Sequence, residues 1–267
     1  RPHASQLRHE PTAYEFTNSL CGTPAPRSGF VQPVVPADRL RRRLNANVRR
    51  LKPAMNYFNH LKSFISAWSA SPLNSLNLDA PWDLTSESVS IVQLLLKQMD
   101  LTEYAVNDEI AVHRTTIIES GAVLKGPLVI GPQCLVAAGA YLRGGNWIGE
   151  RCTFGPGSEL KSSFVFAGSK LAHFNFVGDS ILGERVNLEA GSIICNYRNE
   201  RDDKLVLAMS HGSLISTGRD KFGALIGDDC RLGANAVVAP GALLRPATVV
   251  PRGSVLDQEL GHANRDA

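Results

Sequence analysis

Three basic residues in the middle of the chain are separated by one constant interval. Lys125, Arg143 and Lys161 follow one another at steps of 18 residues, each directly after an aliphatic residue. If this interval brings the three basic side chains together, their like charges repel one another, and a bound anion would stabilise them. A phosphate is an anion that both Arg and Lys bind well. Alternatively, the long side chains spread into water as surface lysines do. The spacing by itself leaves both interpretations open.

His173 and Asn187 are the next candidates for chemistry. His173 lies twelve residues after Lys161, in the segment KLAHFNFVGDS. An imidazole with an ordinary pKa near 6.5 can accept a proton at neutral pH, which is the role of a general base. A structural histidine is the competing interpretation, and the sequence alone favours it. Asn187 precedes Leu188 and is either a turn residue or a ligand contact.

The cysteines predict neither a disulfide framework nor a metal site. They are odd in number, widely spaced and form no C-x-x-C pair, which fits a reducing compartment. None has a histidine at a spacing that suggests a nucleophile, and we expect no metal requirement. The five are Cys21, Cys134, Cys152, Cys195 and Cys230.

Length and composition limit the kinds of protein that can carry these residues. The 267 residues are enough for one large or two small domains, and aromatics are only 7% against 43% hydrophobic residues, so we expect an aliphatic core. A net charge of +3 is too small to indicate a nucleic-acid partner. No apolar run approaches the ~20 residues of a membrane helix, and the N-terminus lacks the pattern of a signal peptide. We therefore expect a soluble, cytoplasmic protein.

A six-residue period positions the candidate residues. Aliphatic or aromatic residues recur at every sixth place, nineteen times in all, with a frame slip at Leu171, another at Leu182 and a pause through 198–220. This period is neither helical nor alternating and is typical of a solenoid in which three short strands close a coil of eighteen residues. The nineteen positions are Ile118, Leu124, Ile130, Val136, Leu142, Ile148, Phe154, Leu160, Phe166, Leu171, Val177, Leu182, Leu188, Ile194, Ile226, Leu232, Val238, Leu244 and Val250.

The predicted fold is mainly β, a parallel β-helix of about six coils spanning 110–256. Small residues follow many of the inward positions, as tight corners require; they include Gly131, Gly149, Gly155, Gly178, Gly183, Gly227 and Gly233. The pattern resembles the hexapeptide repeat of left-handed β-helix acyltransferases, and the left hand is implied by that resemblance alone.

The rest of the chain divides into three further parts. Residues 1–36 have no period and are expected to be extended or disordered, and 257–267 form a tail. Residues 37–109 predict a helical unit with two helices split at Pro53 and a third over 87–99, capped by Thr85 or Ser86, and we expect this unit to cap the first coil. Its arginine-rich face is interpreted as solvated, with an acidic partner or nucleic acid as the alternative.

A longer motif carries a more specific resemblance. The pattern H-x-x-x-x-G-D-x-x-x-G-x-x-V-N, followed by A-G-x-x-x-x-N-Y, begins at His173 and ends at Tyr197. Over 118–256 the chain resembles the acetyltransferase half of the bacterial bifunctional enzymes that acetylate glucosamine-1-phosphate and then uridylylate it. The glycine-rich G-x-G-T-x-M start of the uridyltransferase domain does not occur in this sequence, so uridylyl transfer is not expected.

The resemblance implies a role for each matched residue. It implies that His173 is the catalytic base and that acetyl-CoA is the acyl donor. Direct transfer is expected because the cysteines indicate no nucleophile. Two departures stand out: Phe176 replaces a substrate-binding tyrosine, and 198–220 is an insertion. The implied substrate-binding residues are Arg143, Lys161, Phe176, Asn187 and Lys221, and the implied cofactor-binding residues are Asn196, Tyr197, Ala234 and Arg252.

Three functions remain open at this stage. The leading hypothesis is an acetyl-CoA-dependent N-acetyltransferase that acts on an amino sugar, either phosphorylated or nucleotide-linked. The same fold could instead take its acyl group from an acyl-carrier protein, or it could be a non-catalytic sugar-phosphate-binding scaffold. Because related hexapeptide enzymes are trimers with sites between subunits, the resemblance also implies a homotrimer.

Overall fold

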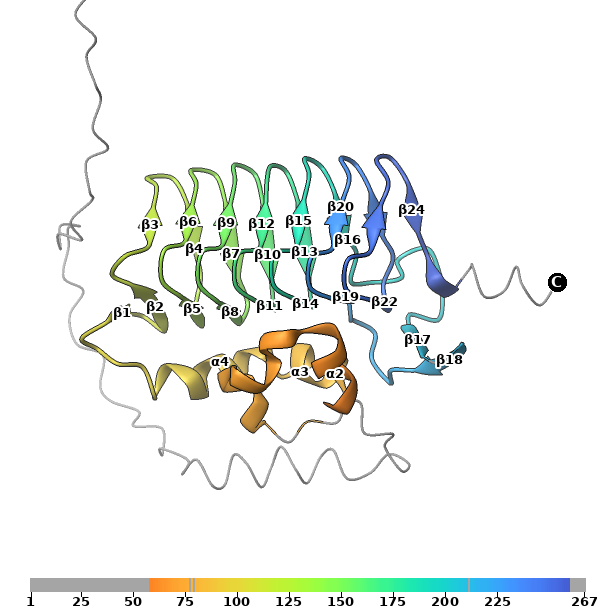
Figure 1. Cartoon of the computed structure of the whole chain (residues 1–267), viewed down its shortest axis with the longest axis horizontal. Helices are drawn as coiled ribbons and strands as arrows, with labels where there is room; N and C mark the ends of the chain where they lie inside the picture. The colour runs from red at the N-terminus through yellow and green to blue at the C-terminus, as the bar shows by residue number, and fades with distance from the viewer. Residues whose placement is uncertain (1–57, 77, 79, 211, 260–267) are drawn as a thin grey trace, which may run out of the picture.

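The computed structural model describes residues 58–259, apart from 77, 79 and 211. Its parallel strands stack into a three-sided coil with a helical layer along one side (Figure 1). The expectations for 1–36, for the helices predicted before residue 58 and for Cys21 lie outside the described residues. None of the helices in the described part of the chain is long and apolar enough to cross a membrane.

Three sheets form the sides of the coil. Sheet A contains β1 (Tyr104–Asn107), β2 (Ile110–His113), β5 (Leu128–Ile130), β8 (Asn146–Ile148), β11 (Phe164–Val165), β14 (Ile181–Leu182), β19 (Ala224–Ile226) and β22 (Ala242–Leu244). Sheet B contains β3 (Ile117–Ile118), β6 (Leu135–Val136), β9 (Thr153–Phe154), β12 (Lys170–Leu171), β15 (Asn187–Leu188), β20 (Arg231–Leu232) and β23 (Val249–Val250). Sheet C contains β4 (Val123–Leu124), β7 (Tyr141–Arg143), β10 (Glu159–Lys161), β13 (Phe176–Gly178), β16 (Ile193–Ile194), β21 (Val237–Val238) and β24 (Val255–Leu256).

The parallel β-helix predicted from the six-residue period is confirmed, but it has more than the predicted six coils. Each sheet has seven parallel strands, because β1 joins sheet A antiparallel to β2. The two additional hexads lie at the ends, where Val112 in β2 and Leu256 in β24 also pack against the core. Val112 lies six residues before Ile118 and Leu256 six residues after Val250, so both continue the period by one step beyond the nineteen positions that were counted.

The interior is aliphatic, as the composition predicted. The inward residues of successive coils lie directly over one another, for example Leu124, Leu142 and Leu160 in sheet C. One predicted inward position is wrong. Val165, not Phe166, pairs with Ile148 and Leu182 and belongs to the interior, so the frame slips one hexad earlier than the sequence suggested. Phe166 instead points out of the coil and contacts the rings of Trp68 and Trp147, at centroid distances of 5.9 and 5.3 Å.

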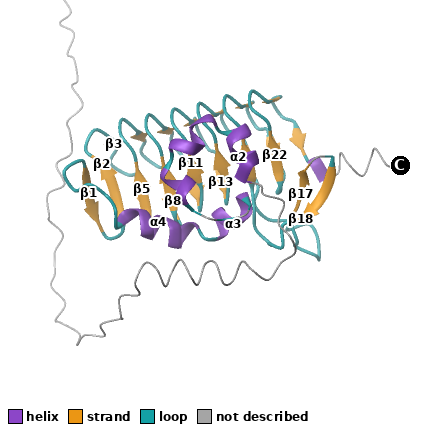
Figure 2. Ribbon diagram, turned by 60° about the horizontal axis from the view of Figure 1, so that its bottom comes forward, coloured by secondary structure: helices purple, strands orange, loops and turns teal. Residues whose placement is uncertain are grey.

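The helical layer covers the outer face of sheet A and does not cap the first coil. It contains α2 (Phe58–Phe64), two 3-10 helices (Ser66–Ala70 and Pro72–Ser75), α3 (Pro81–Ser86) and α4 (Ser88–Leu96), which lie along the stacked strands (Figure 2). The outward residues of sheet A are apolar and buried beneath these helices; they include Ala111, Val129, Phe164, Ile181 and Leu225. The hydrophobic effect therefore holds the layer against this side, since these residues would otherwise face water.

The predicted cap of the last helix is also wrong. Thr85 and Ser86 end α3 and donate their hydroxyls to the carbonyls of Trp82 and Asp83, while α4 starts after Glu87 without a side-chain cap. A buried carboxylate instead fixes the layer to the coil. Asp228 accepts hydrogen bonds from the backbone N–H and the hydroxyl of Ser66, at 2.9 and 2.7 Å.

Three of the four described cysteines belong to a ladder of small side chains at the corner between sheets A and B, and Cys195, which follows β16, does not. Each of the three donates to a backbone carbonyl of a neighbouring coil: Cys134 to Gly149, Cys152 to Phe166 and Cys230 to Arg245. Thr116 and Ser169 occupy the equivalent positions in other coils and donate in the same way. Burial raises the pKa of the Cys230 thiol. These cysteines are therefore small hydrogen-bonding corner residues.

The insertion leaves the coil between sheets C and A, as predicted for a segment that cannot be threaded inside. It forms an antiparallel hairpin of β17 (Leu207–Ser210) and β18 (Ser213–Ser216). Val206 and Ala208 are buried with the helical layer, and Arg219 forms an ion pair with Asp83 of α3 at 3.0 Å. The close approach of Leu207 explains Gly241, because a Cβ there would lie 1.9 Å from the Leu207 carbonyl oxygen.

Candidate active site

The basic residues that recur every 18 residues lie along one edge of the coil, where sheet C ends. Lys161 is the register partner of Arg143, and the N–H of Lys125 bonds to the carbonyl of Leu142 beside it. The spacing suggested that these cations lack partners of opposite charge, but Arg143 and Lys161 each contact a carboxylate. The Arg143 Nε donates to Glu159 at 2.7 Å, and the Lys161 Nζ donates to Asp179 at 2.9 Å.

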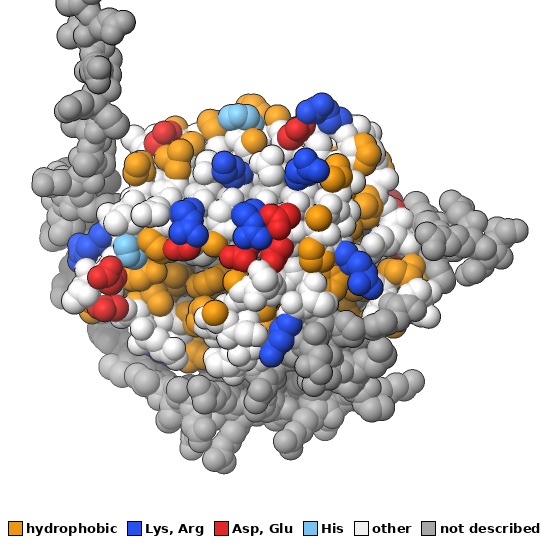
Figure 3. All heavy atoms as spheres, viewed as in Figure 1, with side chains coloured by type: hydrophobic (Ala, Val, Ile, Leu, Met, Phe, Trp, Pro, Cys, Tyr) orange, Lys and Arg blue, Asp and Glu red, His pale blue; other side chains and the backbone are white. Residues whose placement is uncertain are grey.

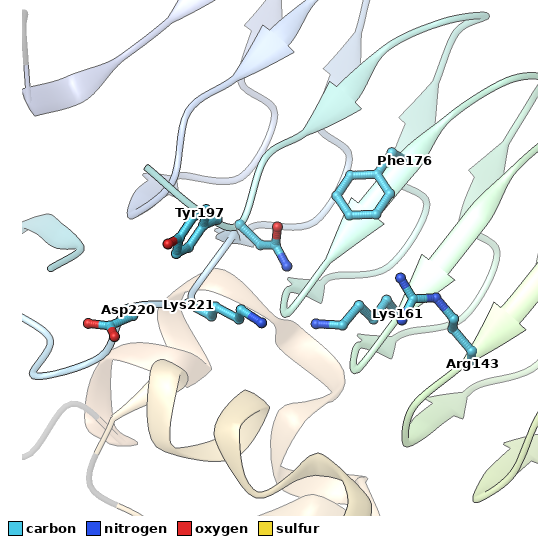
Figure 4. Close-up of a pocket in the computed structure, with 7 residues that line it drawn as sticks. Arg143, Lys161, Phe176, Tyr197, Asp220 and Lys221 are labelled. Carbon is cyan, nitrogen blue, oxygen red and sulfur yellow. The ribbon is translucent and has the colours of Figure 1, made fainter. Parts of the chain in front are cut away.

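A pocket of about 510 Å³ lies against this edge. Six of the ten residues singled out from the sequence line it, together with Asp220. In Figure 4 the ammonium ends of Lys161 and Lys221 point toward one another, with the rings of Phe176 and Tyr197 on the same side of the space between them. The lining residues are Arg143, Lys161, Phe176, Asn196, Tyr197, Asp220 and Lys221.

The two ends of the insertion bring the later residues of the sequence to this pocket. Asn196 and Tyr197 follow β16, where the chain leaves the coil, and Lys221 precedes β19, where it returns. The N–H of Phe222 donates to the carbonyl of Asn196 at 3.1 Å, which closes the neck of the insertion. Lys204 of the insertion lies over the Tyr197 ring, with its Nζ 5.4 Å from the ring centroid. The hairpin itself does not line the pocket.

Gly178 makes room for two of the lining side chains. It ends β13 at the corner between Phe176 and Asp179. A Cβ at residue 178 would lie 2.7 Å from the Asn196 Nδ2 and 2.9 Å from the Phe176 Cζ. The small residue that the corner requires is therefore also what lets the amide and the ring approach the pocket.

His173 lies on a different edge of the coil, between sheets B and C. It follows β12, and in later coils Ala234 follows β20 and Arg252 follows β23 at equivalent places. The imidazole is exposed and forms no hydrogen bond with any side chain that the structure describes. Gly155 in the preceding coil lies against the backbone just before it, because a Cβ there would overlap the Ala172 carbonyl oxygen.

Glu189 links the other two residues of this second edge. Both guanidinium contacts of Arg252 go to its carboxylate, at 2.8 and 2.9 Å, and the N–H of Ala234 also donates to it at 2.9 Å. The hydrogen bonds from Arg252, and then that from Ala234, lower the pKa of Glu189 below its usual value. Ala234 and Arg252 are thus held together, at a distance from the pocket lined by Asn196 and Tyr197.

Asn187 occupies neither edge. It lies on the outer face of sheet B, in register between Lys170 and Arg231. Within one chain, the candidate residues from the sequence therefore lie in three places. Six line the pocket at the end of sheet C, three lie on the edge with His173, and Asn187 lies on sheet B.

Two acidic residues were missed in the sequence: Asp220, which lines the pocket, and Asp179, which contacts two of its lining residues. Asp179 is only 7% exposed and bonds both Lys161 and the Asn196 amide. The sequence contained a signal for this pairing. Gly178 is the register partner of Lys161 in the next coil, and Asp179 directly follows Gly178. No group of three His, Cys, Asp or Glu side chains among the described residues could hold a metal ion. On the face seen in Figure 3, Lys and Arg side chains lie singly, several beside Asp or Glu.

Comparison with known proteins identifies the repeat. Residues 223–258 match the family model described as "Hexapeptide repeat of succinyl-transferase". These residues belong to a hexapeptide repeat. This protein is 38% identical over 104 residues, 39% of its own length, to a bifunctional sugar-1-phosphate nucleotidylyltransferase/acetyltransferase of Sulfurisphaera tokodaii, of which the match covers 25%. It is 34% identical over 186 residues, 67% of its own length, to bifunctional protein GlmU of Methanococcus maripaludis, of which the match covers 44%.

This chain thus spans less than half the length of these two curated relatives. Among solved structures it is similar to the acetyltransferase domain of PglB from Neisseria gonorrhoeae in complex with acetyl coenzyme A. That similarity has a TM-score of 0.27 and 12% identity, and covers 61% of this chain and 71% of that one.

Proposed function

We propose that this chain is an acetyl-CoA-dependent N-acetyltransferase whose acceptor is an amino sugar carrying a phosphate or a nucleotide. The observation that carries the proposal is the pocket in which Arg143, Lys161 and Lys221 lie with Asn196 and Tyr197. Guanidinium and ammonium groups recognise phosphate through charge-assisted hydrogen bonds. The kinship with a sugar-1-phosphate nucleotidylyltransferase/acetyltransferase supports the same substrate class.

In this proposal the acceptor phosphate accepts hydrogen bonds from side chains that contact carboxylates in the free chain. Arg143 and Lys161 exchange part of their contacts with Glu159 and Asp179 for phosphate oxygens, while Lys221 contacts the sugar. Phe176 contributes an apolar wall without a hydroxyl. Asn196 and Tyr197 bind the acetyl-CoA end.

His173 is proposed as the general base. An amine attacks the thioester carbonyl only in its neutral form, so a proton must leave it before or during attack. An exposed imidazole that has no side-chain partner among the described residues is free to take that proton. The attack forms the N–C bond, and the collapse of the tetrahedral intermediate breaks the C–S bond and releases CoA thiolate, so no acyl-enzyme is needed.

The separation of His173 from the pocket supports a site shared between copies. In a homotrimer the edge with His173, Ala234 and Arg252 of one chain faces the pocket edge of the next, and Asn187 on sheet B faces the same cleft. Closed cyclic symmetry repeats this contact three times. Sedimentation should therefore give the mass of three chains.

A donor and acceptor panel tests the function. The protein is incubated with acetyl-CoA, succinyl-CoA or an acyl-carrier-protein thioester, each with amino sugars that are free, 1-phosphorylated or nucleotide-linked, and products are identified by mass spectrometry. Acetyl transfer to the amine of phosphorylated or nucleotide-linked acceptors is expected. Turnover only with the carrier protein would replace the donor, and binding without turnover of any pair would overturn the assignment as an enzyme.

A further inference from the structure

A buried carboxylate just outside the pocket lining connects two of the residues that line it. Asp179 receives the Lys161 Nζ at 2.9 Å, and the same oxygen, Oδ2, accepts the Nδ2 of Asn196. Lys161 belongs to the cation edge of the pocket, and Asn196 belongs to the neck of the insertion. A single oxygen atom therefore holds a phosphate-binding candidate and a CoA-binding candidate in one arrangement.

The surroundings of Asp179 fix this carboxylate. Its side chain is 10% exposed, and that of Lys161 is 18% exposed. The N–H of Asp179 donates to the carbonyl of Lys161, and its own carbonyl accepts the N–H of Gly223, both at 2.9 Å. Since buried ionic hydrogen bonds have few competing water partners, the carboxylate is a rigid reference point.

The contact also determines how Asn196 is oriented. A carboxylate only accepts hydrogen bonds, so the amide must present its Nδ2 to Asp179 and direct its Oδ1 elsewhere. A fixed Oδ1 accepts an N–H, such as that of an acceptor amine or a pantetheine amide. Without Asp179, the Asn196 amide could rotate and present either end.

We propose that Asp179 is a positioning residue that sets Lys161 and Asn196 for acyl transfer without itself contacting the substrate. This inference rests on the proposed function. It predicts different effects on the affinities for CoA and for phosphate. Loss of the Asp179 charge weakens CoA binding, because Asn196 is no longer oriented. It does not weaken phosphate binding, because the negative charge beside Lys161 is gone. A purely structural residue would weaken both together.

The test uses the full chain with Asp179→Asn. Asn suits the positive φ of 45° at this residue, so the backbone conformation is kept. Isothermal titration with CoA and, separately, with inorganic phosphate is expected to give about a fivefold weaker Kd for CoA and an equal or tighter Kd for phosphate, with a lower kcat. Asp179→Glu should restore part of the CoA affinity.

Asp220→Asn is the matched control. Asp220 lines the same pocket but forms no ion pair with any residue that the structure describes. This variant removes the same charge and should change phosphate affinity in the same direction, while CoA affinity stays within about twofold of the parent chain. A loss of CoA affinity equal to that of Asp179→Asn would assign the effect to pocket charge and overturn the inference.

A double mutant separates the inference from the proposed function. If Asp179 acts through Asn196, then Asp179→Asn adds less than twofold to the CoA Kd of Asn196→Ala, whereas independent residues would give multiplied effects and overturn the inference. If the parent chain binds no CoA at all, the proposed function fails. Crystal structures of the parent chain and of Asp179→Asn then test the positioning role. The Asn196 amide and the Lys161 ammonium should move in the variant, and unchanged positions of both would refute the inference.

Discussion

The N–H of Phe222 donates to the carbonyl of Asn196, and this bond joins the chain on either side of the insertion at the mouth of the pocket. Phe222 is fully buried and its ring packs edge-on to Trp82 of α3, with the centroids 5.7 Å apart. The neck of the insertion is therefore fixed by the helical layer, and Lys221 is carried to the pocket on a rigid support.

Replacement of residues 200–218 by a short Gly-Ser linker should leave the β-helix folded. It removes the buried side chains of Val206 and Ala208, so the free energy of unfolding should fall by about 2 kcal/mol. The acceptor profile over the amino-sugar panel should change, because the insertion returns to the coil next to Lys221, the proposed sugar contact. An unaltered profile together with unaltered KM values would show that the insertion has no part in acceptor choice.

His173→Ala should retain the fold and lose most of the acetyl transfer. The side chain is exposed and has no described side-chain partner, so the thermal midpoint should stay within about 2 °C of the parent value. The rate of transfer should fall by about 10² to 10⁴, the range for removal of a general base. Wild-type turnover in this variant would exclude His173 as the base.

Arg143→Ala and Lys161→Ala should each raise the KM for phosphorylated acceptors much more than that for neutral amino sugars. The loss of one charge-assisted contact costs about 1.5 to 3 kcal/mol, which is at least tenfold in KM. Lys125→Ala is the control, since Lys125 stands on the same edge but lies over the Tyr141 ring and does not line the pocket. Equal losses on phosphorylated and neutral acceptors would remove the argument for a phosphate.

Gly178→Ala should impair the pocket as well as the fold. The new Cβ would lie within 3 Å of the Asn196 amide and the Phe176 ring, so both must move. We expect a lower thermal midpoint and a weaker Kd for CoA. Gly131→Ala is the matched control, because its Cβ would meet the Gly149 carbonyl carbon at 2.8 Å on an edge away from the pocket. It should lower the thermal midpoint and leave CoA binding intact, and equal effects of both variants on CoA would refute this prediction.

The ion pair of Glu189 with Arg252 should make a small contribution to stability that depends on pH. The pKa of Glu189 is lowered in the folded chain, so the contribution is present above the usual pKa of 4.5 and is lost as the pH falls through the folded pKa. Thermal midpoints of the parent chain and Glu189→Gln should therefore differ at pH 7 and converge near pH 3. A constant difference over that range would contradict the assigned cause.

The repetitive part of this protein is predictable from its local residue pattern. Leu124, Leu142 and Leu160 recur every 18 residues, and each lies directly over the one before it in the stack. Because every coil repeats this stacking, the local pattern predicts the global fold. The same rule predicts that Arg143 and Lys161 are stacked neighbours, and their register pairing confirms it. It could not place Phe166, because the five-residue step that precedes it is decided by packing against Trp68 and Trp147, which lie far away in the sequence.

The segments that lie beside the repeat are placed by three-dimensional packing. The helical layer covers sheet A because Phe164, Ile181 and Leu225 face outward there, and outward positions follow no six-residue rule. The ion pair of Asp179 with Lys161 and the separation of His173 from the pocket depend on which corner each chain segment reaches. The spacing shows that frame slips occur, but the corner at which the first one falls is set by the long-range packing of Phe166 against Trp68 and Trp147.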